Sequence, residues 1–179
     1  MLFLDETAFT KTTHMTKTWS PRGVHILIDQ AQVYTGYRSV IATVSCEAGV
    51  VLLDIEESIT KKEEVARYLV KLSRRMNKQP FYLFMDKASA HTAGDVKRVM
   101  ESLNIIPIFN ITACPDFNPI EAVFSFVKKD FRRARLNALA NKRDFDLDRE
   151  SNKAFKCVTP NLVTACWKRS LYLLKTFQP

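Results

Sequence analysis

The sequence predicts an α/β fold: a mixed five-stranded sheet with its first three strands antiparallel and with helices on both faces. Three observations support this prediction. β-Branched and apolar runs dominate residues 1–58, the apolar run at residues 81–85 has no polar face, and segments of helical spacing alternate with these runs. The length of 179 residues suits one domain, and 46% apolar with 26% charged residues is typical of a folded protein.

The first part of the chain is expected to form strands. Residues 1–9 read as a strand that contains Asp5, and further β-type runs follow at residues 23–28 and within residues 37–58. The last run divides at a turn, residues 47–49, which contains glycine. These runs predict an antiparallel meander of three strands.

A helix and a central strand are expected next. Residues 60–77 carry an apolar stripe at helical spacing, and Thr60 followed by Glu63 predicts a capping box at the start. Residues 81–85 are apolar on both faces, which is typical of a central parallel strand. A further helix and a short strand are predicted within residues 95–109.

The C-terminal part is expected to be helical on both sides of a polar connection. A helix begins near Pro119, and a charge-mixed connection is predicted at residues 136–153. In the last helix Thr159 is the expected cap and Pro160 lies in the first turn. Its apolar stripe comprises Val163, Cys166, Trp167, Leu171 and Leu174.

Charge and cysteine content narrow the classes of function. The 27 basic and 19 acidic residues leave a net charge of +8, which favours polyanionic partners and nucleic acid first. The four cysteines form no Cys-x-x-Cys pair, so we expect a reduced intracellular protein without a zinc site. Neither a membrane-length apolar run nor a signal-peptide pattern is present, so we expect no membrane association and no secretion.

Three acids at the ends of predicted elements are candidate metal ligands. Asp5 lies on the first strand, Asp86 follows the central strand, and Glu121 opens a helix. If the first and fourth strands are neighbours, Asp5 and Asp86 lie close and repel each other unless a cation separates them. Mg²⁺ prefers such oxygen ligands, and two ions support hydrolysis or transfer of a phosphodiester. The structural alternative is that each acid is a cap or turn residue.

Cations follow Glu121 along the predicted helix. Lys128 and Arg132 fall on the same stripe of the helix as Glu121, and Arg135 lies close by. Such a row is suited to a phosphate backbone that leads away from a cut site, whereas a solvated basic face is the alternative. A second basic cluster, within residues 71–78, ends another helix, where cations are expected in any case.

Three motifs, in this order, resemble the catalytic blocks of the Tc1/mariner and IS630 DDE transposases. They are FLDETAF at residues 3–9, FMDKASAH at residues 84–91 and PDFNPIE at residues 115–121. The second and third acids are separated by 34 residues, which is the spacing of the Tc1-like branch. Residues 19–23, WSPRG, are similar to the Trp-x-x-x-Gly segment that follows the first block in that family.

The resemblance implies an RNase H-like fold and DNA cleavage that depends on two Mg²⁺ or Mn²⁺ ions, followed by strand transfer, typically at TA. The residues in the places of the metal-binding triad are Asp5, Asp86 and Glu121. Asn118 and Pro119 match the turn that sets the third acid at the helix start. His91 matches a histidine for which packing or hydrogen bonding near the site is expected.

The resemblance also implies partners and a location. The expected partner is DNA, both transposon ends and target, and the chain is expected to work as a homodimer or with a partner that supplies DNA recognition. The expected location is the nucleus in a eukaryote, or the cytoplasm and nucleoid in a bacterium.

Two departures from the family pattern leave a second hypothesis open. Lys87 stands where the family usually has Asn, and Met1 lies only four residues before Asp5. We therefore expect residues 1–179 to be a single catalytic domain without the family's N-terminal helix-turn-helix modules. The alternative is a domesticated, non-catalytic DNA-binding or scaffold subunit of a larger complex. Lys87 is expected either to hold a phosphate or to occupy the place of the metal.

Overall fold

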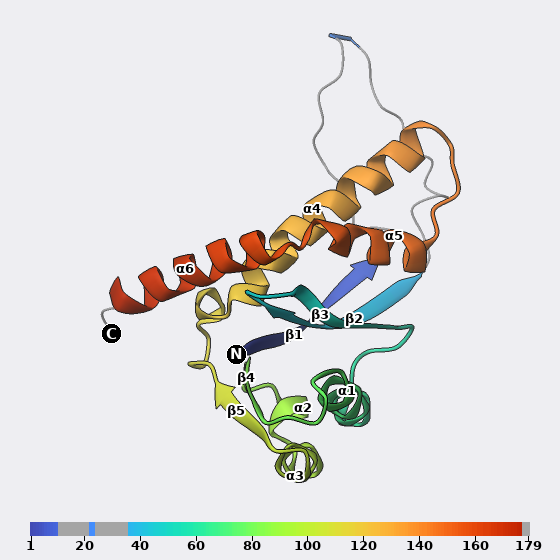
Figure 1. The fold of residues 1–179 in the computed structure, drawn as a ribbon. Coiled ribbons are helices and arrows are strands. Elements are labelled where there is room, and N and C mark those ends of the chain that lie inside the picture. The colour runs from blue at the N-terminus through green and yellow to red at the C-terminus, as the bar shows by residue number, and fades with distance from the viewer. Residues whose placement is uncertain (11–21, 24–35, 177–179) are drawn as a thin grey trace.

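The computed structural model describes residues 1–10, 22–23 and 36–176. In these residues one sheet lies between two layers of helices, as Figure 1 shows, which confirms the predicted α/β architecture. The strand expected at residues 23–28 and most of the segment at residues 19–23 lie outside the described residues. None of the described helices is both long and apolar enough to cross a membrane.

The described elements follow the predicted order of strands, helix, strand, helix, strand and helices, with some short additions. The strands are β1 (Leu2–Thr10), β2 (Tyr37–Ser45), β3 (Gly49–Glu56), β4 (Phe81–Met85) and β5 (Ile105–Phe109). The helices are α1 (Lys62–Arg75), α2 (Ser89–Thr92), α3 (Gly94–Ser102), α4 (Pro119–Ala140), α5 (Leu147–Ala154) and α6 (Pro160–Thr176). Two 3-10 turns, η2 (Pro115–Phe117) and η3 (Phe155–Cys157), precede α4 and α6.

Strand β1 lies at the centre of the sheet and makes it mixed. The strand order is β3-β2-β1-β4-β5, with β1 antiparallel to β2 and parallel to β4. Phe3 pairs with Phe84, so continuing this parallel register by two residues places Asp86 beside Asp5. The expectation that the first and fourth strands are neighbours is therefore confirmed.

Helices α1 and α3 cover one face of the sheet. The buried cluster between them and the strands comprises Leu2, Leu4, Ile41, Val65, Tyr68, Leu69, Leu72, Phe81, Leu83, Met85, Val96, Met100 and Ile105. The Tyr68 hydroxyl is buried in this layer but lies 2.8 Å from Thr43 Oγ1 and 2.9 Å from the Leu52 carbonyl oxygen. A buried polar group with partners costs little, so this contact ties α1 to the sheet.

The start of α1 differs from the prediction. Lys61 occupies the cap position, and its N–H donates to Glu64 Oε2 at 3.0 Å. Thr60 Oγ1 instead lies 2.6 Å from Ser39 Oγ on β2. The predicted cap at Thr60 with Glu63 is therefore wrong by one residue, because a partner on the sheet engages the hydroxyl.

Helices α4, α5 and α6 cover the other face, where aromatic side chains fill the core (Figure 1). The ring of Phe131 lies 4.6 Å from that of Phe9 on β1 and 5.3 Å from that of Phe145, measured between centroids. Offset and edge-on aromatic pairs at such distances stabilise a core beyond their buried area. This layer fixes α4, and with it Glu121, against β1.

The polar connection predicted at residues 136–153 is wrong. Helix α4 continues to Ala140, and α5 begins at Leu147 within that segment. Phe145 and Leu147 are buried, and the Asp146 side chain caps α5 by accepting from the Arg149 N–H at 2.9 Å. Most side chains of this segment are polar or charged, which is why the sequence predicts a solvated connection. The buried side chains of Phe145 and Leu147 nevertheless pack the segment against the core.

The last helix starts as predicted. Thr159 Oγ1 accepts a hydrogen bond from the Leu162 N–H at 3.3 Å, which confirms the cap. Val163 and Cys166 are buried in the core, whereas Leu174 is 46% exposed because it lies near the end of α6, beyond most of its contacts. The predicted apolar stripe is therefore correct in its first half and wrong at Leu174.

Gly49 begins β3 with a φ of +71°, and a Cβ at this position would lie 2.5 Å from the Val158 carbonyl oxygen. We expect Gly49→Ala to lower the free energy of unfolding by about 2–4 kcal/mol, because it combines left-handed strain with a backbone collision. Urea denaturation measures this loss. Gly94→Ala is the matched control, because its Cβ would come no nearer than 4.0 Å to Arg98; equal stability of the two variants would contradict the prediction.

Candidate active site

The three predicted acids meet at one cavity of about 340 Å³, called here the acid cavity. Asp5 comes from the middle of β1, Asp86 from the residue after β4, and Glu121 from the first turn of α4. The remaining wall is the loop between β5 and α4, which is held by buried Asn110, whose side-chain amide donates to the Cys114 carbonyl at 2.7 Å. Distant parts of the chain thus converge at one end of the central strands.

Asp5 is the most buried of the three acids, with 7% of its surface exposed. Its Oδ1 accepts from the Glu6 N–H at 2.8 Å and its Oδ2 accepts from Asn118 Nδ2 at 3.2 Å. Burial raises the pKa of Asp5 to about 7; the Glu6 N–H lowers this pKa, and the charges of Glu6, Glu121 and Asp86 raise it. Without a cation, the folded protein therefore disfavours an ionised Asp5.

Asn118 precedes α4 but does not cap it with its side chain. Its amide Nδ2 faces two acceptors, Asp5 Oδ2 and the Leu4 carbonyl, which fixes the orientation of the amide. Among the described residues the buried Oδ1 has no hydrogen-bond partner. Pro119 supplies the first helical residue, where its missing N–H costs nothing. The turn before Glu121 is therefore built to hold Asp5 as well as to start the helix.

Asp86 is held on one side and open on the other. Its Oδ1 accepts from the Ala88 N–H at 2.9 Å and from His91 Nδ1 at 2.7 Å, whereas Oδ2 accepts no hydrogen bond from the described residues. The contact with Ala88 is the turn role that the structural alternative predicted. The side chain nevertheless remains 48% exposed at the acid cavity, so one oxygen is available to a ligand.

His91 is fully buried and connects two acids. Its Nδ1 faces Asp86 and its Nε2 lies 2.8 Å from Glu6 Oε1. Burial lowers the pKa of His91, but the hydrogen bond and charge of Glu6 and the charge and hydrogen bond of Asp86 raise it to about 9. At neutral pH the imidazolium therefore donates to both carboxylates and fixes the position of Asp86.

Glu6 is a site residue that the sequence reasoning missed. It follows Asp5 on β1, and because side chains alternate across a strand it points to the opposite face, towards His91. The available signal was a second acid directly after Asp5 within a predicted strand. An acid at such a position requires a partner, and His91 is that partner.

Glu121 is the exposed member of the three acids. Partial burial raises its pKa, the charge of Lys128 lowers it, and the charges of Asp86 and Asp116 raise it. Lys128, two turns along α4, is therefore close enough to Glu121 for its charge to stabilise the ionised carboxylate. The predicted neighbourhood of Glu121 and Lys128 is present in the structure.

The predicted cations differ in their exposure and in their neighbours. Lys87 lines the acid cavity but is exposed, and it makes no ion pair with Asp5, Asp86 or Glu121. Of the row on α4, Arg132 is exposed and Lys128 is half-buried.

Arg135 has a different position from the one expected. It is only 4% exposed, and its guanidinium carbon lies 5.0 Å from the centre of the Phe145 ring. Burial lowers its pKa. The side chain packs between α4 and the segment before α5, on the core side of the helix, so little of its surface faces solvent; its contact with nucleic acid stays a prediction.

The chemistry of the acid cavity fits a hard divalent cation. It offers carboxylate oxygens and the unpartnered amide oxygen of Asn118, and mutual repulsion of the acids would be relieved by a positive ion. In the described part of the chain, no three His, Cys, Asp or Glu side chains form a complete metal cage. Mg²⁺ commonly takes one or two carboxylates and completes its shell with water and phosphate oxygens, so an incomplete cage suits it.

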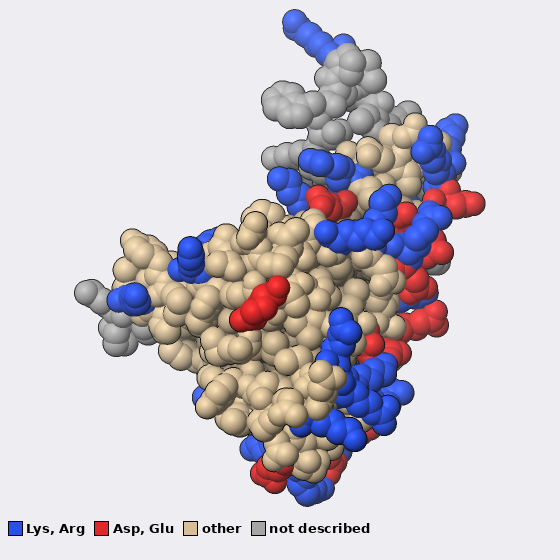
Figure 2. Space-filling model, in the orientation of Figure 1, with Lys and Arg blue, Asp and Glu red and all other residues tan. Residues whose placement is uncertain are grey.

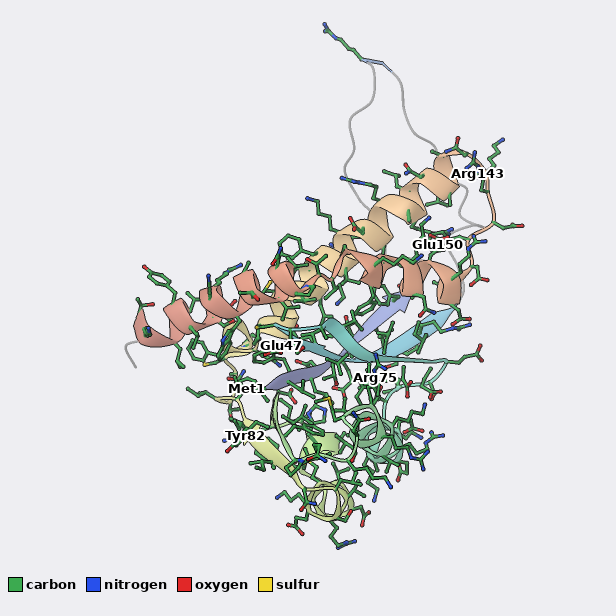
Figure 3. All side chains as sticks on the ribbon, viewed as in Figure 1. Met1, Glu47, Arg75, Tyr82, Arg143 and Glu150 are labelled. Carbon is green, nitrogen blue, oxygen red and sulfur yellow. The ribbon has the colours of Figure 1, made fainter. Side chains whose placement is uncertain are left out.

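A larger cavity, of about 650 Å³, lies at the far end of α4 from Glu121. Arg143 and Glu150, labelled in Figure 3, belong to its walls. Its charges largely neutralise one another, as in the 3.1 Å ion pair of Arg149 with Glu150. We assign the chemistry to the acid cavity because burial and the charges of neighbouring acids raise the pKa values of Asp5 and Glu121 there.

The raised pKa of Asp5 predicts a pH effect on the metal-free protein. The folded pKa of about 7 exceeds the unfolded value of 3.8, so the contribution of Asp5 to stability is full below about pH 4 and is lost as the pH rises through 7. In EDTA, the free energy of unfolding of Asp5→Asn minus that of wild type should increase by about 1–4 kcal/mol as the pH rises from about 4 to about 8.

Urea denaturation at several pH values measures this difference. Asp116→Asn removes an exposed acid nearby and is the matched control, for which a pH-independent difference is expected. Parallel pH profiles for wild type and Asp5→Asn would contradict the assignment of a strained carboxyl.

Comparison with known proteins identifies the family and the fold. The sequence model of the DDE superfamily endonucleases matches residues 1–142. No curated protein matches the sequence.

Solved structures of the Mos1 mariner transposase share the fold. The Mos1 strand transfer complex aligns with a TM-score of 0.64 at 17% identity, over 97% of this chain and 51% of that chain. The paired-end complex with Mn gives 0.65 at 13% identity, over 98% and 54%. The isolated Mos1 catalytic domain gives 0.53 at 14% identity, over 94% and 81%.

This chain thus spans about half the length of the transposase chains in the two complexes. The matches confirm the RNase H-like fold and the resemblance of the chain to the DDE family. The chain belongs to the DDE superfamily endonucleases, and its described residues have the fold of the Mos1 catalytic domain.

Proposed function

We propose that the chain is the catalytic domain of a transposase that cuts DNA with divalent metal ions and joins the freed 3′-OH to target DNA. The observation that carries the proposal is the convergence of Asp5, Asp86 and Glu121 on one cavity from β1, β4 and α4. The similar Mos1 structures are described as strand transfer and paired-end complexes, the latter with Mn or Mg, which supports the same chemistry here.

Asp5, Asp86 and Glu121 would hold two Mg²⁺ or Mn²⁺ ions. When bound, such ions supply activation of the attacking oxygen and stabilisation of the leaving oxygen. The chain's own residues keep the carboxylates in position: Asn118 donates to Asp5, and His91 donates to Asp86. Because these partners are buried, the carboxylates are positioned before the substrate arrives.

The position of Lys87 favours an enzyme over a non-catalytic subunit. A cation that replaced the metal would form ion pairs with the acids, and Lys87 forms none with Asp5, Asp86 or Glu121. Its exposed ammonium at the cavity wall is instead suited to a phosphate group of the substrate.

DNA is the proposed partner, and we propose that a homodimer or a further protein supplies recognition of the DNA ends. Figure 2 shows Lys and Arg side chains gathered over α1 and around α4 and α5, which is consistent with the net charge of +8. Action on chromosomal DNA implies a nuclear location in a eukaryote and a nucleoid location in a bacterium.

Asp86→Asn should abolish metal-dependent nicking of DNA, because the amide keeps the size of the side chain but removes the charge that binds a cation. The loss should be at least about 100-fold, measured as nicking of supercoiled plasmid with Mn²⁺ or Mg²⁺. Asp144→Asn, an exposed acid in the larger cavity, is the control and should retain activity. DNA binding without cleavage, unchanged by Asp86→Asn, would overturn the enzyme proposal.

Replacement of both Lys128 and Arg132 by Ala should weaken DNA binding about tenfold and flatten the dependence of log K on log salt by about 2, because two phosphate contacts are lost. Fluorescence anisotropy with a labelled duplex measures both quantities. The matched control replaces Arg74 and Arg75, two exposed cations on α1 in the other layer. An equal loss in the two double variants would show a general charge effect and count against a track along α4.

A further inference from the structure

A second groove lies beside the acid cavity, on the other side of Glu121. It has a volume of about 360 Å³ and is formed by η2, the start of α4 and α6; we call it the α6 groove. Pro115, Asn118 and Glu121 belong to the walls of both, so the α6 groove and the acid cavity meet at these residues. The α6 groove therefore adjoins the acid cavity at Glu121.

Arg169 is the cation of the α6 groove. Its side chain is exposed, and it forms no ion pair with Asp116 or Glu121, the two acids that line the same groove. The cation that acts on Glu121 is Lys128, on α4. The guanidinium of Arg169 is thus not neutralised by the acids around it.

The backbone that carries Arg169 is fixed. Ser170, the next residue, is buried, and its hydroxyl donates to the Asp116 carbonyl oxygen at 2.8 Å. One turn earlier Cys166 is buried in the core, and α6 runs beside the turn that leads into α4 (Figure 1). Arg169 therefore extends from a fixed backbone, so that binding a ligand would order only its side chain.

The charges around Glu121 suit a chain of phosphates. Lys87 lies in the acid cavity and Arg169 in the α6 groove, so cations occur on two sides of the three acids. A free anion in the α6 groove would be repelled by Asp116 and Glu121. A DNA backbone held at the acid cavity would instead bring its next phosphates to the groove, and a guanidinium can bind a phosphate with two hydrogen bonds.

We propose that the α6 groove holds the DNA backbone that continues from the scissile phosphate, and that Arg169 binds a phosphate there as a positioning residue. This inference rests on the proposed function, because it takes the acid cavity as the place of cleavage. The residues matched by the family model end at 142, so α6 and Arg169 lie outside that match.

The test compares Arg169→Ala and Arg169→Lys with the control Lys168→Ala, which removes the same charge from the neighbouring exposed position of α6. Affinity for a short labelled DNA duplex is measured with Mg²⁺, at a temperature too low for cleavage, over a range of salt concentrations. Arg169→Ala should weaken binding about five- to tenfold and flatten the salt dependence by about 1. Arg169→Lys should restore the salt dependence but only part of the affinity, and Lys168→Ala should resemble wild type.

Two results would overturn the inference. One is that Arg169→Ala binds DNA as tightly as Lys168→Ala and wild type. The other is that inorganic phosphate alone competes with the duplex at wild-type Arg169 and not at Arg169→Ala, which would identify a site for free anions. Equal melting temperatures of the variants exclude unfolding as the cause of a loss.

Cleavage assays separate this inference from the proposed function. With Mn²⁺, Arg169→Ala should raise KM about fivefold or more with kcat little changed, as expected for lost substrate binding. Weakened binding by Arg169→Ala with no cleavage by wild type would refute the proposed function and leave the groove as a DNA contact. Cleavage by wild type with unchanged KM in Arg169→Ala would refute the groove alone.

Discussion

The acid cavity depends on one energetically unfavourable arrangement. The carboxyl of Asp5, buried on the central strand, lies beside two other acids, Asp86 and Glu121. Burial and the charges of its neighbours raise its pKa, so the ionised site is unfavourable until a cation arrives. Only a rigid position can hold such a group. Strand β1 provides it, because β1 is paired on both sides and packed on both faces.

The two helical layers each contribute to the site from their own side. From the layer of α1–α3, His91 reaches Asp86 and is itself held by Glu6. On the side of α4–α6, the Asn118 amide donates a hydrogen bond to Asp5. The Ser170 hydroxyl donates to the Asp116 carbonyl, which holds α6 against the turn before α4. The acids are thus fixed by packing that lies on opposite faces of the same sheet. Loosening either hydrophobic cluster would alter the spacing of the acids.

The positive charge of the protein is divided between structural and accessible cations. Arg135 packs over Phe145, and Arg38 joins β2 to α5 through Asp148 at 2.7 Å, so these cations serve the fold. Lys87 and Arg169 lie instead at the walls of adjoining cavities, both of which Glu121 lines. Net charge alone, which favours a polyanionic partner, does not distinguish these groups.

The sequence by itself determined the sheet, its strand types and the three acids, because these depend on local patterns and on motif spacing. The unbroken apolar run at residues 81–85 favours an internal strand, and β4 is one, although Tyr82 on it is 53% exposed. The tertiary structure alone decided which side chains meet: that Glu6 pairs with His91, that Arg135 turns into the core, and that α6 brings Arg169 next to the acids. Helical and strand periodicities fix the direction of a side chain on its own element, whereas its partner is set by how elements distant in sequence pack.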